Sequence, residues 1–446
     1  MLRRHEMALL CTIGTLLCYA DRTNISVALP SFEPDHAMQG RVLSAFFYGY
    51  ICTQVLGAHW ALLHGPKRVL LIGVAVWTLF DLLTIPTART PTLLWFVRAG
   101  MGLGEGILFP SLHVVAASWY PVNERSRLMS LVSSGVDLGT ILSMAVAPLL
   151  LSAFGWPSIF VTFGGLSALW LVAFLWRGSS KPEMDKAISL TEKATILAQR
   201  DVFNHKLVAL QAVSSRRLLT SRGAWAIYSA HFAFNFGWYV LLGWMPLYFR
   251  EKLHVPVATS GFTSACPYIA GYIGVLVWGI VSDKWIQMGH KPLVVRKIMN
   301  AVGLVGAAVC FGLMRFTHST AMAVVVLSLA LFFGRAATLG YWVHMVDVSP
   351  THAGHIMGIS NTIGTVPGIV GNIFTGWMLA RSEHNWDIVF GVVAGVLLCG
   401  AAIFHVWATE HLDEDDNGSH AKKDYMNKLL LDDDDGLHLE RDEFFI

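Results

Sequence analysis

The chain has 446 residues, of which 54% are hydrophobic and 14% are charged, and its formal net charge is +2. An ordinary soluble domain carries roughly 25% charged residues. The low charge and a mean hydropathy of +0.53 therefore exclude a soluble protein and indicate one that crosses a membrane many times. Continuous apolar runs, long enough to cross a bilayer, recur between Met7 and Trp407 and favour helices over a barrel.

In chain order, the apolar runs predict six spans, a polar linker and six further spans. The first six cover 7–30, 40–63, 67–86, 92–119, 126–152 and 156–176, and the last six cover 223–249, 257–283, 292–314, 319–346, 353–380 and 386–408. The expected organisation is therefore a first half (1–176), a basic linker (177–222), a second half (223–408) and an acidic tail (409–446). Lys and Arg gather in the linker and the even-numbered loops, so the positive-inside rule places both termini in the cytoplasm.

The two halves share a sequence pattern. GWPSIFVTFGG (155–165) aligns with NWDIVFGVVAG (385–395) at an offset of 230, which pairs Trp156 with Trp386. Pro121 and Pro350, each after the fourth span of its half, pair at an offset of 229. A duplication of six spans is typical of the major facilitator fold, in which two pseudo-symmetric six-helix halves enclose a site near the midplane. The sequence therefore predicts an all-α membrane protein with twelve transmembrane helices.

Two charges stand in the fourth span, within RAGMGLGEG (98–106). Seven residues on an α-helix return nearly to the same face, so Arg98 and Glu105 point the same way, two turns apart. Charges on a lipid-facing surface are costly, and we expect both to face the bundle interior or a water-filled cavity. His113 continues the same broad face. The alternative is an internal ion pair that only locks the helix, although the gap is long for a direct contact.

The first span carries Asp21 and Arg22 within CYADRTNISVALP (18–30). Adjacent helical residues differ by about 100°, so one arrangement points Arg22 into the cavity and Asp21 toward a helix seam, where it could carry a proton. The alternative places both in the hydrated interfacial layer. Two further deep charges, Asp137 and Arg335, have two interpretations: a third cationic site for a polyvalent anion, or a fixed internal bridge.

Six stretches carry a resemblance to a known family. They are YADRTNISVA (19–28), FFYGYICTQ (46–54), RAGMGLGEGILFPSLH (98–113), YPVNERSR (120–127), WAIYSAHFAFNFGWYVLLGWMPLYF (225–249) and MGISNTIGTVPGIVG (357–371). Together they resemble the anion:cation symporter family of the major facilitator superfamily, which includes sialin, type I sodium-phosphate transporters, plant phosphate transporters and bacterial hexonate symporters. The resemblance extends from about residue 7 to 408.

The resemblance implies roles for individual residues. Arg22 and Arg98 would bind the anionic group of the substrate, Glu105 would couple transport to protons with Asp21 as its partner, and His113 would modulate the coupling. Polar residues expected around the cavity, which could instead only pack helices together, are Tyr48, Tyr50, Gln54, Asn235, Tyr239, Ser360 and Asn361.

The chain also departs from the family pattern. Leu43 and Phe234 stand where vesicular glutamate transporters have a histidine and an arginine, so glutamate is not the expected substrate. Leu62 and Leu63 replace the usual Asp-Arg pair after the second span, which puts the cytoplasmic charge latch of the first half in doubt. The corresponding Asp283 and Lys284 of the second half are present.

The function expected is secondary active transport of an organic anion or inorganic phosphate by alternating access, with H⁺ favoured over Na⁺ as the coupling ion. The alternatives are a Na⁺-dependent phosphate transporter and a transporter-derived receptor or scaffold. The sequence predicts no enzyme activity, catalytic residue, cofactor or metal site, since no metal-ligand spacing or activated nucleophile emerges and the six cysteines lack paired spacing. The expected partners are a small anion and the lipid bilayer, with no nucleic acid and a monomeric state. Plasma membrane and endomembrane remain open alternatives.

Overall fold

The computed structural model describes residues 2–198, 215–348, 353–382 and 385–410, and these residues are almost entirely helical. The middle of the predicted linker (199–214) and nearly all of the predicted acidic tail (411–446) lie outside the described residues.

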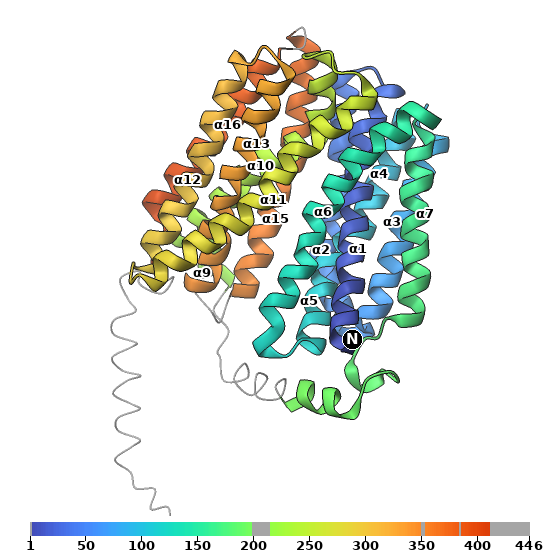
Figure 1. Ribbon diagram of the computed structural model, residues 1–446, viewed down its shortest axis with the longest axis vertical. Helices are drawn as coiled ribbons and strands as arrows, with labels where there is room; N and C mark the ends of the chain where they lie inside the picture. The colour runs from blue at the N-terminus through green and yellow to red at the C-terminus, as the bar shows by residue number, and fades with distance from the viewer. Residues whose placement is uncertain (1, 199–214, 349–352, 383–384, 411–446) are drawn as a thin grey trace, which may run out of the picture.

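The helices of the first half form one bundle, drawn in blue to green in Figure 1. They are α1 (Arg3–Ala28), α2 (His36–His64), α3 (Pro66–Thr87), α4 (Pro91–Gly106), α5 (Leu108–Trp119), α6 (Val122–Phe154) and α7 (Pro157–Arg177).

The helices of the second half form a second bundle beside the first, drawn in yellow-green to red in Figure 1. They are α9 (Ser215–Thr220), α10 (Arg222–Glu251), α11 (Val257–Gln287), α12 (Pro292–Leu313), α13 (Thr320–Ala337), the π-helix η4 (Thr338–Trp342), α14 (Val343–Val348), α15 (Ala353–Arg381) and α16 (Trp386–Trp407).

Nine helical stretches of the described residues are long and apolar enough to cross a membrane, and α4 with α5 forms one of them, as do α13, η4 and α14. Helices α1, α2 and α10 have 26, 29 and 30 residues, so they miss the same standard by composition and not by length. These three helices carry many of the polar and charged residues predicted for the cavity. With them, the described residues form the twelve spans that the sequence predicts.

The fourth span is not the continuous helix that the sequence predicts over 92–119. It breaks at Ile107, between α4 and α5. Pro110 explains the break, because a proline ring clashes with the carbonyl group four residues earlier, here that of Gly106. The corresponding span of the second half changes at a similar depth, where α13 gives way to the π-helix η4. The break places Glu105 in the last turn of α4.

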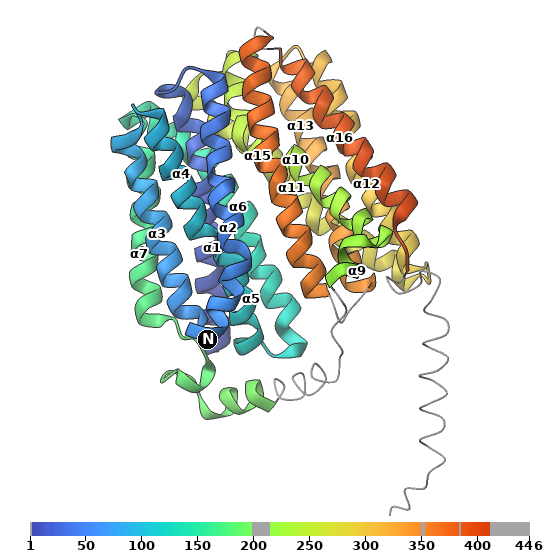
Figure 2. The ribbon, with the colours of Figure 1, turned by 180° about the vertical axis from the view of Figure 1, so that it is seen from behind.

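The two bundles meet at the end of the molecule opposite the N-terminus, which we call the distal end. The imidazole Nε2 of His36 and the carboxylate of Glu251 lie 2.9 Å apart there. Gly40 of α2 and Gly376 of α15 let the two backbones touch, since a Cβ atom on Gly376 would overlap the carbonyl oxygen of His36. Figures 1 and 2 show the ribbons converging at this end and diverging toward the N-terminus.

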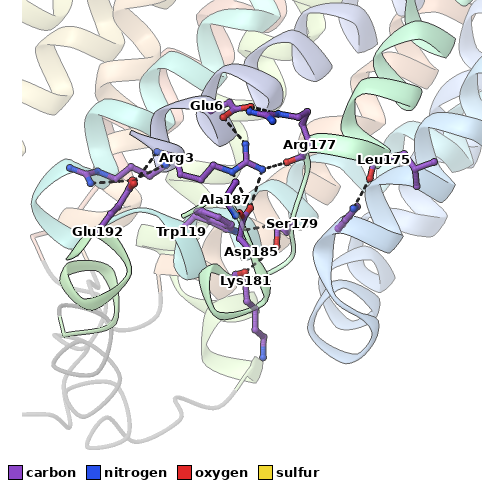
Figure 3. A network of polar contacts seen from close by, with 12 residues as sticks. Arg3, Glu6, Trp119, Leu175, Arg177, Ser179, Lys181, Asp185, Ala187 and Glu192 are labelled. Atoms are coloured by element: carbon purple, nitrogen blue, oxygen red, sulfur yellow. Dashed lines mark hydrogen bonds and ion pairs between the residues drawn. The ribbon is translucent and has the colours of Figure 1, made fainter. Parts of the chain in front are cut away.

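The opposite end, which we call the linker end, is held by charged groups around the start of α1 (Figure 3). Glu192 of the linker accepts hydrogen bonds from the backbone N–H groups of Arg3 and Arg4, both at 3.0 Å. The guanidinium of Arg3 also bonds to Asp185, and that of Arg4 bonds to Glu124 of α6 at 2.8 and 2.9 Å. We call Arg3, Arg4, Glu124, Asp185 and Glu192 the linker clamp. It fastens residues 181–198 to the first bundle.

Candidate functional site

The centre of the first bundle contains an ion pair between α1 and α4. Arg22 donates from Nε to Glu105 Oε2 at 2.9 Å, and its Nη2 lies 2.8 Å from the same oxygen. The thiol of Cys18, one turn earlier on α1, also lies 3.1 Å from this oxygen. Glu105 is fully buried, and its other oxygen has no hydrogen-bond partner among the described residues. The carboxylate is therefore held at one oxygen by Arg22 and free at the other.

Aromatic rings surround the guanidinium of Arg22. Its central carbon lies 4.5 Å from the ring centre of Tyr19, 4.7 Å from that of Phe46 and 4.8 Å from that of Tyr50. The rings of α2 come this close because Gly102 of α4 packs directly on the backbone of α2, where a Cβ atom would overlap the carbonyl oxygen of Phe46. A cation next to an aromatic face is stabilised by the quadrupole of the ring. The rings therefore help to keep the charge of Arg22 away from water.

Arg98 lies near the same centre, but Glu105 pairs with Arg22 and not with Arg98. The side chain of Arg98 is 1% exposed, and its Nη1 contacts the sulfur of Met101 at 2.7 Å. Its Nε has no hydrogen-bond partner among the described residues. A buried guanidinium with an unused N–H group is costly unless an acceptor arrives. Arg98 is thus a cationic group with capacity to bind an anion.

A small cavity lies between the two bundles and brings both guanidiniums to one wall. The opposite wall belongs to α10 and α15 and supplies Tyr239 and Asn372. The ring of Tyr239 packs on Phe47 with the ring centres 4.6 Å apart. The lining residues are Arg22, Ile25, Ser26, Leu43, Phe46, Phe47, Arg98, Tyr239, Leu242, Gly243 and Asn372.

The other predicted residues of the second bundle lie between α10 and α15. Asn235 donates from its amide to the backbone oxygen of Gly364 at 2.7 Å. Ser360 is fully buried, and its hydroxyl lies 2.8 Å from Nδ1 of His231. The imidazole of His231 stacks on Tyr341 of the π-helix η4, with ring centres 5.1 Å apart. Asn235 and Ser360 thus join α10 to α15 beside the cavity and do not line it.

Four predicted residues lie away from the two arginines. Tyr48 is 40% exposed and packs on Trp95, on a different face of α2 from Phe46 and Tyr50. Gln54 is buried, and its amide has no hydrogen-bond partner among the described residues. Asn361 is half-buried, and His113 of α5 is exposed. The structure does not bring these four into the cavity.

Asp137 and Arg335 form an ion pair that joins α6 of the first bundle to α13 of the second. The guanidinium of Arg335 also lies 4.3 Å from the ring centre of Trp238 on α10. Of the two interpretations offered by the sequence, this geometry favours the internal bridge. The bridge crosses between the bundles, so it also bears on how they move.

Sequence reasoning missed several buried polar residues near these groups. Asp81 on α3 is fully buried, and the amide of Asn24 donates to it at 3.3 Å. Ser167 on α7 donates to Asp21 at 2.6 Å. Asn372 accepts from the indole of Trp244 at 2.9 Å. The rule that drew attention to Arg98, a charge inside an apolar span, also applies to Asp81 and would have found it.

Among the described residues, no three His, Cys, Asp or Glu side chains lie together in a way that could hold a metal ion. The arrangement places two guanidiniums and one carboxylate, which pairs with Arg22, at the centre of the first bundle.

Comparison with known proteins matches the family model described as the Major Facilitator Superfamily to residues 11–372. Among curated proteins, the chain is 34% identical to "Sodium-dependent phosphate transport protein 1, chloroplastic" of Arabidopsis thaliana, covering 91% of this chain and 79% of the relative. It is 35% identical to "Ascorbate transporter, chloroplastic" of the same plant, covering 91% and 75%. It is 31% identical to human sialin, covering 91% and 89%.

Solved structures show the same fold. A bacterial homologue of the human lysosomal transporter Spinster, in an inward-facing and occupied conformation, matches with a TM-score of 0.71 and 17% identity, covering 91% of this chain and 97% of the other. The xylose transporter XylE of E. coli, in an inward-open conformation, matches with a TM-score of 0.69 and 15% identity, covering 91% and 97%. The twelve-helix fold predicted from the duplication is confirmed.

Proposed function

The chain belongs to the Major Facilitator Superfamily, and within it to the anion:cation symporter family, and from this premise we propose that it is a secondary active transporter of a small anion. The observation that carries the proposal is the cavity between the bundles, which has the guanidiniums of Arg22 and Arg98 on one wall. Guanidiniums bind carboxylate and phosphate groups through two parallel hydrogen bonds. One chain supplies the whole lining, which supports a monomer as the working unit.

The linker end of the molecule is the cytoplasmic end in this proposal, because the basic residues of the linker and the even-numbered loops gather there. Both termini are then cytoplasmic. The bundles touch at the distal end, which becomes the outer or lumenal side. The structure therefore corresponds to an inward-facing state, and transport requires the bundles to separate at the distal end and close at the linker end.

Glu105 is the proposed proton switch. When Glu105 is ionised it occupies Arg22, as in the structure, where nitrogen and oxygen lie 2.8 Å apart. Protonation removes that competition and leaves both guanidiniums for the anion. In an inward-facing state the returning carboxylate would compete for Arg22 again and help to expel the substrate. Asp21 and His113 are the further proposed coupling residues.

The substrate class follows from the chemistry of the cavity and the similar proteins. Two of them are named for transport of phosphate and of ascorbate, and both compounds are small anions that two guanidiniums can hold. We propose inorganic phosphate or a small organic anion as substrate, with H⁺ as the coupling ion. The Na⁺-dependent alternative differs only in the driving ion.

Counterflow in proteoliposomes tests the proposal. Vesicles are loaded with inorganic phosphate, ascorbate, gluconate or N-acetylneuraminate, and uptake of the same labelled anion is measured at two pH values with and without Na⁺. We expect saturable exchange of at least one anion, and accumulation that follows a pH gradient without Na⁺. Exchange of none of the four would overturn the anion transporter, and accumulation driven only by a Na⁺ gradient would overturn proton coupling.

A further inference from the structure

A second polar cluster lies in the first bundle, in the seam between α1, α3 and α7. It contains two carboxylates, Asp21 and Asp81, and both are fully buried. The hydroxyl of Ser167 donates to Asp21 Oδ2 at 2.6 Å, and the amide of Asn24 donates to Asp81 Oδ1 at 3.3 Å. Neither acid lines the cavity that holds Arg22 and Arg98.

We call Asp21 and Asp81 the seam pair. In each carboxylate one oxygen accepts a hydrogen bond and the other accepts none among the described residues. Asp21 Oδ1 and Asp81 Oδ2 have no hydrogen-bond partner among the described residues, and neither has the amide oxygen of Asn24 beside them. The three unused atoms are all acceptors, whereas the one unused donor of α3 near them is the buried indole N–H of Trp77, one turn before Asp81. The acceptors therefore outnumber the donors of the cluster. A buried ionised carboxylate without a donor is costly, and two that repel each other are more so.

The charged groups around the pair leave one carboxylate in excess. On α4 lie Arg98 and Glu105, and on α1 lies Arg22, which Glu105 already occupies. On α7, no ionisable side chain precedes Arg177 at the linker end. The remaining groups do not serve the pair, because Asp137 of α6 is bound to Arg335 and His113 of α5 is exposed. Two guanidiniums thus face three carboxylates: Asp21, Asp81 and Glu105.

A proton fits this cluster better than a metal cation. Hard cations such as Ca²⁺ and Mg²⁺ take about six or more oxygen ligands, whereas the seam offers three unused oxygens. A proton needs only one acceptor to bind and one to share. Within the seam it would convert one carboxylate to a carboxyl group, which then donates its O–H to a free oxygen.

We propose that Asp21 and Asp81 together form one proton-binding site that is separate from the Arg22–Glu105 pair. The inference deepens the proposed function and rests on it. The ring of Phe80, next to Asp81 on α3, packs against α4 at Gly100, two residues from Arg98, so Asp81 and Arg98 lie at the same level of the α3–α4 contact. When an anion binds Arg98, Asp81 loses part of its counter-charge, and the pair takes up a second proton from solution. No bond other than the new O–H is formed or broken.

Infrared spectroscopy of the purified, anion-free protein tests the site itself. At neutral pH we expect a C=O stretching band from a protonated carboxyl group that is absent in Asp81→Asn and also absent in Asp21→Asn, because the acid left behind no longer has a like-charged neighbour. Asp283→Asn, which removes an exposed carboxylate elsewhere, should keep the band. An unchanged band in both seam variants would overturn the shared site, and the two variants together guard against one of them failing to fold.

Proton uptake on addition of anion tests the link to Arg98. With an anion that the wild type exchanges, Asp81→Asn should take up about one proton fewer per anion bound, and its anion affinity should depend less steeply on pH than that of the wild type, because only Glu105 still titrates. Glu105→Gln should also take up one proton fewer per anion bound than the wild type, because its proton site is a different one. If Asp81→Asn takes up as many protons as the wild type, the inference fails although the transporter stands. If the wild type exchanges no anion, the infrared test still decides the site, and only the transport proposal falls.

Discussion

At the scale of single residues, the candidate site depends on competition for two guanidiniums. The guanidinium of Arg22 is paired with the carboxylate of Glu105, with nitrogen and oxygen 2.8 Å apart, and three aromatic rings surround it. Arg98, in contrast, has an N–H group without a hydrogen-bond partner among the described residues. The two arginines therefore differ in how available they are to an anion. Arg98 can accept an anion without displacing a carboxylate, and Arg22 becomes available only when Glu105 is neutralised.

The first prediction concerns Glu105→Gln. The amide cannot ionise, so it cannot reclaim Arg22 from the anion in response to pH. We expect counterflow to persist and accumulation driven by a pH gradient to disappear, measured in the same proteoliposomes. Glu410→Gln, which removes an exposed carboxylate at the end of the described residues, should keep both activities. Full pH-driven accumulation by Glu105→Gln would contradict the proposed switch.

The second prediction concerns Arg98→Lys, which keeps the charge and removes the planar fork. A hydrogen bond to a charged group contributes about 1.5–3 kcal/mol, and tenfold in affinity corresponds to about 1.4 kcal/mol. We therefore expect KM for the exchanged anion to rise about 10-fold to 100-fold, with a smaller change in kcat. Arg315→Lys, at the distal surface of the second bundle, serves as the control. Equal KM values in Arg98→Lys and the wild type would remove Arg98 from the anion site.

At the scale of helices, glycines set how closely the two bundles approach at the distal end. A side chain at Gly376 of α15 would meet the backbone of His36 and Gly40, which cannot move aside as a flexible side chain can. A side chain at Gly391 of α16 would meet no atom within 4 Å. The two positions thus form a matched pair for testing whether the distal contact holds the inward-facing state.

The third prediction is that Gly376→Val separates the bundles at the distal end and Gly391→Val does not. Spin labels at the exposed positions Pro34 and Lys252 report the separation, in a background without the accessible cysteines Cys52, Cys266 and Cys399. We expect a longer distance distribution and slower counterflow only in Gly376→Val. An unchanged distribution in that variant would show that the α2–α15 contact does not set the conformation.

The linker clamp is a second contact between structural elements, because it fastens the linker to the first bundle. Leu62 and Leu63, which stand where the family has its Asp-Arg latch, are 72% and 64% exposed, while the clamp fastens residues 181–198 at the same end of the bundle. The hydrogen bond from Arg4 lowers the pKa of Glu124 below its ordinary value. A carboxylate with a lowered pKa contributes stability that is present above the ordinary value and lost as the pH falls through the lowered one.

The fourth prediction follows from the lowered pKa of Glu124. Glu124 holds the guanidinium of Arg4, which in turn bonds to Glu192 of the linker at 3.3 Å. Hydrogen exchange of residues 190–198, which are helical, should therefore stay slow from neutral pH down to about pH 4, the ordinary pKa of Glu, and accelerate below it. Arg4→Gln should accelerate exchange already at neutral pH. Lys186→Gln removes one positive charge from an exposed linker position and should not. Equal exchange in both variants would mean that the clamp does not hold the linker.

Helix periodicity predicted some of these relations and not others. The seven-residue spacing placed Arg98 and Glu105 on one face, and apolar runs with the 230-residue offset predicted the twelve spans. Spacing within a helix does not identify its neighbours, so the partnership of Glu105 with Arg22 and of Asp21 with Ser167 could not be derived. The break at Ile107 could not be predicted from Pro110 alone, because α6, α10, α11 and α15 remain continuous although each contains a proline.

At the scale of the whole molecule, the bundles are joined through buried charge as well as through packing. Asp137 and Arg335 pair across the boundary, and their side chains are only 9% and 12% exposed. Breaking a buried pair by removing one partner leaves an uncompensated charge and costs about 3–5 kcal/mol. The bridge therefore favours the conformation in which it forms, here the one closed at the distal end. A third anion site would instead require Arg335 to be free.

The fifth prediction separates these two roles. If Arg335 serves the bridge, Arg335→Gln lowers Tm and changes the counterflow rate, and its KM for every anion of the panel stays within about twofold of the wild type, a difference under 1 kcal/mol. The exchanged pair Asp137→Arg with Arg335→Asp restores Tm and rate toward the wild type, because the attraction across the boundary does not depend on which bundle carries which sign. If Arg335 binds substrate, Arg335→Gln raises KM most for polyvalent anions, and the exchanged pair cannot restore it, since the guanidinium then projects from α6. Loss of polyvalent anion binding without rescue would replace the bridge with a third cationic site.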